Sequence, residues 1–371
     1  MRVFSRREAV SAAAVMLGGC AVRRSTISTT PPFPRLARVN VSADRVTRVI
    51  TGLRPFRPAG FLVRAEKLDD KLVVHNYGHG GAGITLSWGT AQLACDLATG
   101  PRRECAVLGC GVNGLSTARL LQLRGYSPVI YARDLPPSTT SNVAGGLWDP
   151  VTVYDDDRVT PEFRKQFGEA ARFAFRRYQS LAGDQYAVRW LPLYNLSTRA
   201  AHQAPSAESA YSEVEPLYPE KKVLAPGEHP FTVPFVYRRD SMLIEPAIYL
   251  AALMRDFFIA GGRVVVREFS ERRELMALRE SLIFNCTGLG AGKLFGDAEI
   301  IPVKGQLVFL LPQPEVEYMT VGPRDIYMFP RHDGILLGGS HDSGVGNLDV
   351  DADVTARILR ENGELFGGMR A

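Results

Sequence analysis

The fold is decided by residues 104–125, which read ECAVLGCGVNGLSTARLLQLRG. A short apolar stretch at 104–108 runs into a Gly-x-Gly-x-x-Gly turn, and residues 115–124 continue with helical spacing before a second apolar stretch at 127–131. The first two glycines of such a turn let the chain bend and a pyrophosphate approach, and the third lets helix and strand pack closely. This pattern predicts the strand, helix and strand of a dinucleotide-binding Rossmann unit.

The glycine turn and the end of the second strand carry the first candidate cofactor contacts. Backbone N–H groups at the start of a helix can face phosphate charge, and an acidic residue after the second strand can accept hydrogen bonds from ribose hydroxyls. NAD and FAD enzymes share this motif, so it does not by itself choose between them. The residues assigned to these contacts are Gly109, Gly111, Val112, Asn113, Gly114, Arg133 and Asp134.

The run that follows distinguishes FAD from NAD. Residues 137–148 read PSTTSNVAGGLW, and we call them the hydroxyl-glycine run: hydroxyl groups suit a pyrophosphate, and the small residues leave room for a flat ring. The run resembles the D-amino-acid oxidase family of FAD enzymes, which has a Thr-rich, Ala/Gly-Leu-Trp sequence at this place. Residues 285–288, NCTG, match the family's second FAD contact. The resemblance implies cofactor-binding roles for Thr140, Ser141, Gly145, Gly146, Leu147 and Thr287.

Two further family motifs lie before the Rossmann unit, at residues 52–58 (GLRPFRP) and 74–85 (VHNYGHGGAGIT). In the family the first arginine of Gly-x-Arg-Pro holds the substrate α-carboxylate, a task that suits the planar, permanently charged guanidinium. The resemblance therefore implies this catalytic role for Arg54. The glycine-rich turn would wrap the polar edge of the flavin through Gly80, Gly81, Gly83 and Thr85. His75 and His79 in this turn are expected to support other residues or to face solvent, not to catalyse.

A third motif, residues 326–331 (IYMFPR) with 335–339 (ILLGG), matches the family's Tyr-x-x-Pro strand and the next strand. The resemblance implies that the Tyr327 hydroxyl helps fix the substrate carboxylate and amine. The family often has another tyrosine four residues earlier, where this chain has Pro323. His341 occupies a position that holds a cation in aspartate-preferring relatives, which favours a polar or acidic substrate side chain.

The family order of motifs is restored when residues 105–365 are read before residues 38–98, so the resemblance implies a circular permutation with its joint at residues 99–103. The expected fold class is α/β: a Rossmann-like FAD-binding domain plus a mostly antiparallel α+β substrate domain. The predicted divisions are an export signal (1–20), a tether (21–37), a discontinuous FAD-binding domain (38–150 and 240–300), a substrate domain (151–239 and 301–350) and a C-terminal helix (351–371).

The N-terminal residues predict export. Ser5-Arg6-Arg7 precedes an apolar stretch at 9–19, which resembles a Tat signal, and residues 17–20 (LGGC) resemble a lipobox that would place a lipid anchor on Cys20. The expected location is the periplasm or the periplasm-facing membrane; if the stretch is only a basic leader with a chance cysteine, the protein would be cytoplasmic.

Composition and cysteine spacing exclude several classes. The 371 residues are 46% hydrophobic and carry a net charge of +5, typical of a globular protein without a nucleic-acid surface. The four cysteines after the leader show no CxxC pair and no metal-ligand spacing, so no metal site is expected, and buried unpaired thiols are favoured.

These features together predict oxidative deamination of a D-amino acid by FAD and molecular oxygen, giving a 2-oxo acid, ammonia and hydrogen peroxide. The D-configuration rests on the family resemblance alone. Four alternatives remain: a membrane-anchored dehydrogenase that passes electrons to quinone, a sarcosine- or glycine-type amine oxidase, a non-catalytic flavin-binding lipoprotein, and an NAD-dependent dehydrogenase.

Overall fold

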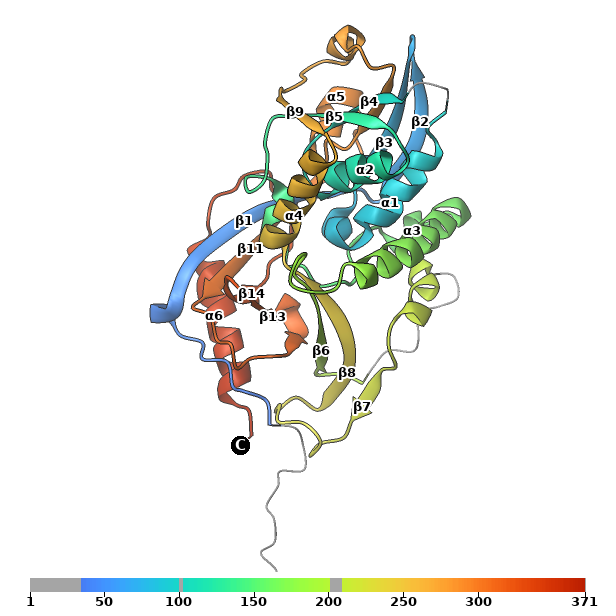
Figure 1. The fold of residues 1–371 in the computed structure, drawn as a ribbon. Coiled ribbons are helices and arrows are strands. Elements are labelled where there is room, and N and C mark those ends of the chain that lie inside the picture. The colour runs from blue at the N-terminus through green and yellow to red at the C-terminus, as the bar shows by residue number, and fades with distance from the viewer. Residues whose placement is uncertain (1–34, 100–102, 201–208, 371) are drawn as a thin grey trace, which may run out of the picture.

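The computed structural model describes residues 35–99, 103–200 and 209–370. Within these residues the chain forms two sheets, one of six strands and one of nine, with helices packed against both (Figure 1). The export signal and nearly all of the tether predicted from the sequence lie outside the described residues.

The six-stranded sheet contains the predicted Rossmann unit. Its described strands pair in parallel except for β2, which is antiparallel to β3. Their order is β2 (Leu62–Leu68), β3 (Lys71–Tyr77), β10 (Leu282–Asn285), β4 (Glu104–Leu108), β5 (Ser127–Ala132) and β9 (Arg263–Val266).

The nine-stranded sheet is antiparallel at every described pairing except that between β12 and β6. Strand β15 (Asp342–Ser343) pairs with β11 outside the main order. That order is β1 (Val46–Phe56), β11 (Ile301–Leu310), β14 (Gly334–Gly338), β13 (Tyr327–Arg331), β12 (Met319–Val321), β6 (Val188–Ser197), β8 (Phe235–Ile244) and β7 (Lys222–Leu224). The two sheets confirm the expected class, a Rossmann-like domain with a mostly antiparallel α+β domain.

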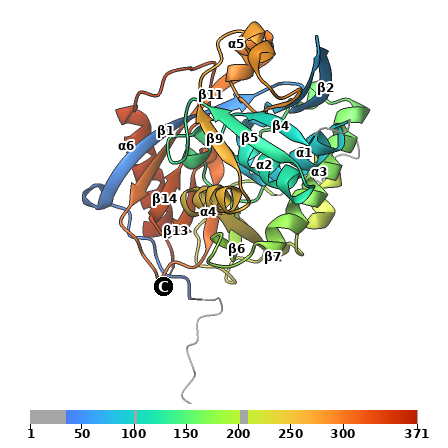
Figure 2. The same ribbon diagram turned by 45° about the horizontal axis from the view of Figure 1, so that its top comes forward.

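Six α-helices of the described chain cover these sheets: α1 (Gly83–Asp96), α2 (Val112–Leu123), α3 (Pro161–Ser180), α4 (Pro246–Ile259), α5 (Gly290–Phe295) and α6 (Ala352–Gly367). Helix α1 packs against α2 and α3, and α2 also packs against α4. Helix α6 lies on the far side of the molecule from this group, against β11 and β14 (Figure 2).

The two faces of the nine-stranded sheet have different partners. One face packs against α6 through an apolar cluster that includes Val308 and Ile358. The opposite face carries a second cluster, to which Phe329, Leu243 and, from the hydroxyl-glycine run, Leu147 belong. We call this second face, against which the hydroxyl-glycine run packs, the inner face.

Two expectations about helices are corrected. The apolar residues 242–260 predict a single helix, but residues 242–244 complete β8 and the helix begins at Pro246, because proline suits the first helical position. The sequence of residues 151–240 shows no clean alternation of strand and helix, yet helix α3 lies within it. It has start signals that the interpretation passed over: Thr160 accepts a hydrogen bond from the Phe163 N–H, and Pro161 follows it.

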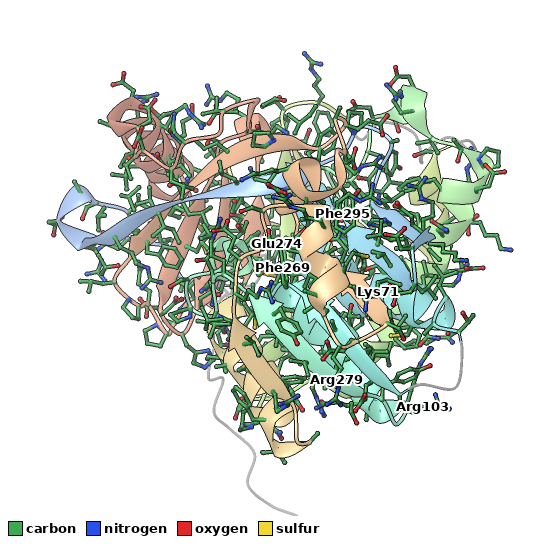
Figure 3. The ribbon with its side chains drawn as sticks, turned by 90° about the horizontal axis from the view of Figure 1, so that it is seen from above. Lys71, Arg103, Phe269, Glu274, Arg279 and Phe295 are labelled. Carbon is green, nitrogen blue, oxygen red and sulfur yellow. The ribbon has the colours of Figure 1, made fainter. Side chains whose placement is uncertain are left out.

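The N-terminal segment takes part in both sheets. Strand β1 pairs with β11 from Val46 to Phe56, and β3 lies inside the six-stranded sheet between β2 and β10. The C-terminus lies beside the first described residues (Figure 1), where the Tyr318 hydroxyl donates to the Ala37 carbonyl at 2.8 Å and Arg38 donates to the Met369 carbonyl. At the opposite end, Arg103 follows the predicted joint at the edge of the molecule (Figure 3).

Candidate active site

The glycine turn after β4 has a shape that requires its glycines. Gly109 has φ +103°, and a Cβ there would lie 2.5 Å from the Cys286 carbonyl oxygen. A Cβ on Gly114 would lie 2.0 Å from the Gly109 carbonyl oxygen, so any larger residue would push helix α2 away from the turn. Gly111 has ordinary backbone angles, and a Cβ there would lie 3.0 Å from Ser141 Oγ.

The hydroxyl-glycine run meets this turn through one of its predicted phosphate-binding hydroxyls. Ser141 Oγ accepts a hydrogen bond from the Val112 N–H at 2.9 Å, so it stands at the amino end of α2. Thr140 is exposed beside it, whereas the preceding Thr139 is buried and donates to Asn142 Oδ1 at 2.8 Å. The structure thus places the Ser141 hydroxyl at the helix end, and Thr140 is its exposed neighbour in the chain.

The amino ends of α1 and α2 lie side by side. A Cβ on Gly83 would lie 3.9 Å from Val112 Cγ1, and the Asn113 side-chain amide is 2.9 Å from His79 Nδ1. Asn113 Oδ1 is buried and has no hydrogen-bond partner among the described residues. Two helix ends without side-chain caps of their own present N–H groups and partial positive charge, which is a setting for an anion such as a pyrophosphate.

His79 is a buried structural residue and does not face solvent. Its Nε2 lies 2.8 Å from Thr90 Oγ1, and burial lowers the pKa of His79 to about 3. The ring is therefore neutral and can accept from Asn113 and donate to Thr90. His75 is also buried, with Nε2 3.0 Å from Glu66 and Nδ1 3.1 Å from Asn285. Of the two expected roles, support of other residues is the one observed for both histidines, and neither faces solvent.

The second glycine turn packs closely against Thr152. Gly80 has φ +55°, and a Cβ there would lie 2.2 Å from the Thr152 carbonyl oxygen, which accepts from the Gly81 N–H at 3.1 Å. Thr85, in the first turn of α1, donates to the Leu147 carbonyl at 3.4 Å. The turn and the hydroxyl-glycine run are thereby joined into one cradle.

The remaining predicted cofactor residues surround this cradle. Arg133 pairs with Asp134 at 2.7 Å just after β5, and both side chains are largely exposed. Thr287, after β10, lies next to Gly109 and donates to Asn285 Oδ1 at 2.7 Å. Gly146 has φ +96°, and its carbonyl accepts from Ile244 at 2.8 Å, which fixes the run against β8.

Arg54 and Tyr327 come together on the inner face of the nine-stranded sheet. The Arg54 guanidinium lies over Gly305, where a Cβ would be 2.4 Å from Nη1, and Nη1 donates to the Ser340 carbonyl at 3.2 Å. Burial raises the pKa of the Tyr327 phenol, while the charge and hydrogen bonding of Arg54 oppose the rise. No carboxylate pairs with Arg54 in the part of the chain that the structure describes.

Tyr327 also faces the hydroxyl-glycine run. Its ring stacks on Phe329 with centroids 4.9 Å apart, and a Cβ on Gly145 would lie 3.0 Å from Phe329 Cε2 and 3.7 Å from Tyr327 Cε2. His341 lies near Arg54 and is exposed overall. Partial burial of its side chain and the charge of Arg54 lower the His341 pKa, whereas the charge of Asp325 raises it. An arginine without a carboxylate partner in the described chain, a tyrosine hydroxyl and a glycine of the run thus lie close together on the inner face.

Comparisons with known proteins agree with this geometry. The family model described as FAD dependent oxidoreductase (DAO) matches residues 29–97 and 104–370. The chain belongs to the DAO family of FAD-dependent oxidoreductases. Among relatives of this DAO protein, the D-amino-acid oxidase of Rubrobacter xylanophilus is 30% identical over 262 residues, which cover 69% of this chain and 75% of the relative. The human D-aspartate oxidase is 28% identical over 259 residues, covering 68% and 73%.

Solved structures of DAO-like fold support the architecture. The glycine oxidase of Geobacillus kaustophilus superposes with a TM-score of 0.53 at 15% identity and covers 72% of this chain and 80% of its own. At this identity the likeness concerns the fold alone.

The residues of this DAO-family chain fit FAD. The cradle combines two helix amino ends, a buried acceptor without a partner at Asn113 and hydroxyls at Thr140 and Ser141. Glycines line the cradle where side chains would fill it. The chain is therefore an enzyme with FAD as its cofactor.

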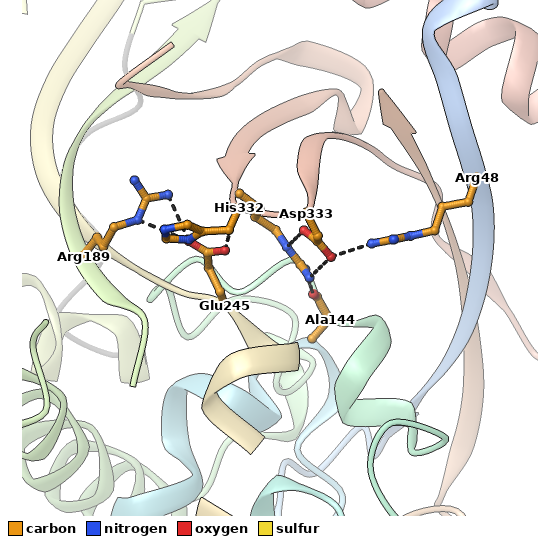
Figure 4. Close-up of polar contacts among 7 residues, drawn as sticks. Arg48, Ala144, Arg189, Glu245, His332 and Asp333 are labelled. Carbon is orange, nitrogen blue, oxygen red and sulfur yellow. Dashed lines mark hydrogen bonds and ion pairs between the residues drawn. The ribbon is translucent and has the colours of Figure 1, made fainter. Parts of the chain in front are cut away.

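Sequence reasoning missed the polar network that holds the β13–β14 turn (Figure 4). Arg331 is buried; it donates to the Ala144 carbonyl at 3.2 Å and pairs with Asp333 at 2.9 Å, which Arg48 of β1 also contacts at 2.5 Å. Only the adjacent Tyr-x-x-Pro motif marks this position in the sequence. The network fixes Ala144, which directly precedes Gly145, to two strands of the nine-stranded sheet.

A second set of polar contacts holds the other side of the β13–β14 turn (Figure 4). Glu245, buried at the start of α4, accepts from the His332 N–H at 2.7 Å and from Arg189 at 3.0 Å. These contacts join residues far apart in the sequence, so no local sequence pattern predicts them.

Other expectations concern metals, thiols and membranes. Among the described residues, no group of His, Cys, Asp or Glu side chains is arranged to hold a metal ion. The four cysteines there, Cys95, Cys105, Cys110 and Cys286, are free and buried. None of the helices in the described ranges is long and apolar enough to span a membrane.

Proposed function

We propose that this DAO-family enzyme oxidatively deaminates D-amino acids to 2-oxo acids, ammonia and hydrogen peroxide. The observation that carries the proposal is Arg54. It lies on the inner face beside Tyr327 and is half-buried without a carboxylate partner in the described chain. A guanidinium in this state favours binding a carboxylate from outside, since two parallel hydrogen bonds would then satisfy its charge.

Each residue of the site has a defined task in this proposal. Arg54 binds the α-carboxylate, and the neutral Tyr327 hydroxyl donates to the carboxylate or accepts from the amine. The apolar residues of the inner face exclude water around the α-carbon. When bound, FAD would accept the hydride from the α-carbon and be reoxidised by oxygen, which yields peroxide. The imino acid released hydrolyses to the 2-oxo acid and ammonia.

The FAD contacts belong to the same proposal. Gly109, Gly111 and Gly114 leave room for the pyrophosphate, which the N–H groups of Val112 and Asn113 and the hydroxyls of Thr140 and Ser141 would bind. Beyond the phosphates, the ribose would meet Asp134 and Arg133, Thr287 would make a further contact, and the ring would lie along Gly145, Gly146 and Leu147 with its polar edge at Gly80, Gly81, Gly83 and Thr85.

The experiment is peroxide release by the purified, FAD-loaded protein with matched D- and L-amino acids. Turnover of D-forms only, with peroxide in stoichiometric amount, supports the proposal. Reduction of the flavin by D-amino acids without peroxide would point to a dehydrogenase that uses another acceptor, such as a quinone. Turnover of L-forms, or of neither, would refute the proposed substrate class.

We further propose that the chain is a circular permutant of its family. The family model matches in two segments that flank residues 98–103, and the first and last described residues are in contact through Tyr318, Ala37 and Met369. Neighbouring termini are what such a rearrangement needs, since joining the old ends and opening an exposed connection leaves the core intact. The division into a discontinuous FAD-binding domain and a substrate domain is part of this proposal.

Export with a lipid anchor at Cys20 is likewise proposed from the sequence. The Tat-like and lipobox-like patterns support it. A Cys20→Ala variant is expected to lose membrane association while keeping peroxide release; a variant that stays bound to membranes would refute the anchor.

A further inference from the structure

A buried charged cluster lies on the same sheet face as the proposed substrate site. Strand register shows this: Tyr327 pairs with Val321, Val321 with Asn195, and Asn195 with Tyr237 of β8. Directly paired residues share a face, and residues two apart on a strand do so as well. Arg239, two residues after Tyr237, therefore projects from the inner face, as Tyr327 does.

Arg239 forms a cluster with two side chains from other segments. Its Nη2 lies 3.4 Å from Asp149 Oδ2, its guanidinium carbon lies 3.5 Å from the Tyr218 ring centre, and the Tyr218 hydroxyl donates to Asp149 Oδ1 at 2.5 Å. Burial raises the pKa of the Asp149 carboxyl, and Arg239 opposes it. The side chains of Arg239 and Asp149 are 11% and 19% exposed.

The cluster lies at the end of the hydroxyl-glycine run. Asp149 directly follows Trp148, the last residue of that run, and the Ser241 hydroxyl of β8 donates to the Trp148 carbonyl at 3.0 Å. Leu147 packs with Tyr327 in the apolar cluster of the inner face. Travelling along the run from Gly145, which lies against Phe329, one therefore reaches Asp149 at the far end of the proposed site.

Stability does not explain this pair. Taking two charges out of water costs about as much as their attraction returns, and apolar side chains of similar size often replace such a pair without loss. The 3.4 Å separation is long for a charge-assisted hydrogen bond, and Arg239 Nε is buried without a partner among the described residues. The residue paired with Arg239 on β6 is the buried Leu193, which belongs to the apolar cluster of the inner face.

We propose that Arg239 and Asp149 form the end of the side-chain pocket and select D-amino acids whose side chain ends in a neutral amide or ureido group. An ion pair presents N–H donors beside carboxylate acceptors, and a carboxamide offers the complementary oxygen and N–H group. A substrate carboxylate would face Asp149, and a substrate cation would face Arg239, so both are disfavoured. This inference rests on the proposed D-amino-acid oxidation and specifies its substrate.

The position of the cluster favours a long side chain. Three strand spacings separate β13, which carries Tyr327, from β8, which carries Arg239, and they amount to about 14 Å at ~4.8 Å each. D-glutamine and D-citrulline are therefore expected to be better substrates than D-asparagine.

The test compares kcat/KM of the FAD-loaded full chain for D-glutamine, D-glutamate and D-norleucine, with D-alanine as reference. We expect kcat/KM for D-glutamine to exceed that for D-glutamate and D-norleucine at least tenfold. The D-glutamate carboxylate would be repelled by Asp149, and the apolar end of D-norleucine would leave the buried polar groups without a partner. In Arg239→Leu the ratio of D-glutamine to D-alanine should fall at least tenfold, and in Tyr218→Phe it should fall less. Arg238→Leu is the matched control, since Arg238 points to the opposite face and pairs with Asp240.

Every outcome of this test supports or contradicts the inference, and the failure of the inference can be told from the failure of the proposed function. If the wild-type enzyme oxidises D-amino acids but does not prefer D-glutamine, the inference is wrong and the proposed function stands. The same holds if Arg238→Leu changes the ratio as much as Arg239→Leu does. If no D-amino acid is oxidised, the proposed function fails and this inference fails with it. Flavin content and melting temperature identify a variant that has not folded, in which case the wild-type substrate panel alone decides.

Discussion

The same substitution should impair different properties at the two arginines of the GLRPFRP motif, substrate binding at Arg54 and folding at Arg57. Arg54 contacts the Ser340 carbonyl at 3.2 Å and Tyr327 and has no carboxylate partner in the described chain. Arg57, three residues later, is buried and pairs with Asp297 at 2.8 Å and Glu299 at 2.6 Å. Arg54→Met is therefore expected to impair substrate binding, and Arg57→Met to impair folding.

The magnitudes follow from these contacts. A charge-assisted hydrogen bond contributes about 1.5–3 kcal/mol, so two to a substrate carboxylate contribute about 3–6 kcal/mol. At about 1.4 kcal/mol per factor of ten, Arg54→Met should lower kcat/KM about 10²- to 10⁴-fold. Breaking the buried pair of Arg57 should cost about 3 kcal/mol, the low end of the usual range because Glu299 is 40% exposed. For a chain of 371 residues, that corresponds to a fall in melting temperature of roughly 4 °C.

Peroxide release and thermal unfolding, measured on both variants with FAD in excess, separate the two roles. Arg54→Met should keep the wild-type melting temperature within about 2 °C, because it loses only a 3.2 Å hydrogen bond to a carbonyl and the contact with the Tyr327 hydroxyl, and no ion pair. Arg54→Lys should recover part of kcat/KM, since it restores the charge but not the planar fork. An Arg54→Met enzyme with unchanged kcat/KM, or one that simply unfolds, would refute the assignment of Arg54 to the substrate.

Three further outcomes test the surroundings of the site. Gly114→Ala places a Cβ 2.0 Å from the Gly109 carbonyl oxygen, so it should lower FAD retention and melting temperature. Gly363→Ala on α6 places a Cβ at an ordinary contact distance, 4.0 Å from Val41 Cγ1, and should lower neither. His79 has its pKa lowered to about 3 from 6.5, so the unfolded state takes up a proton first. As the pH falls from 6.5 to 3, this group should therefore lower the free energy of unfolding by about 1.4 kcal/mol per pH unit. Urea unfolding of His79→Gln, measured at several pH values, should show a free energy of unfolding that depends less on pH than that of the wild type. Finally, the four buried thiols should resist a thiol reagent in the native protein and react in urea, as peptide mapping would show.

The sequence predicted best those elements whose signals are local. Strand β4 was expected at residues 104–108, where it lies, and β5 ends one residue beyond its predicted end, because a glycine turn flanked by apolar stretches allows few alternatives. Helix α4 was placed too early, because the apolar residues 242–244 suit a helix as well as a buried strand. Only the pairing of β8 with β6 decides between the two, and that pairing is not local.

The predicted site residues were also those with a motif of their own. Arg54, Tyr327 and the glycines lie in short conspicuous sequences, whereas Asp149 and Arg239 do not, and Arg331 only follows the Tyr-x-x-Pro motif without a role that the motif assigns to it. The partners of these three come from other segments: Asp149 and Arg239 are 90 residues apart, and Arg331 reaches Ala144 across 187. Their roles depend on strand register and on how a loop crosses a sheet, and a single sequence does not encode these in any local pattern.

The proposed circular permutation also bears on how the site is assembled. Arg54 on β1 and the turn at Gly80 belong to the N-terminal segment, while Tyr327 and the turn at Gly109 belong to the remainder. Strand β3 lies inside the six-stranded sheet and β1 pairs along the whole of β11, so neither sheet is complete without this segment. A module that docked onto a finished fold would add strands at edges only. The interior position of β3 instead makes the N-terminal segment part of the core, and the cradle and the substrate site can form only once both parts of the chain have folded together.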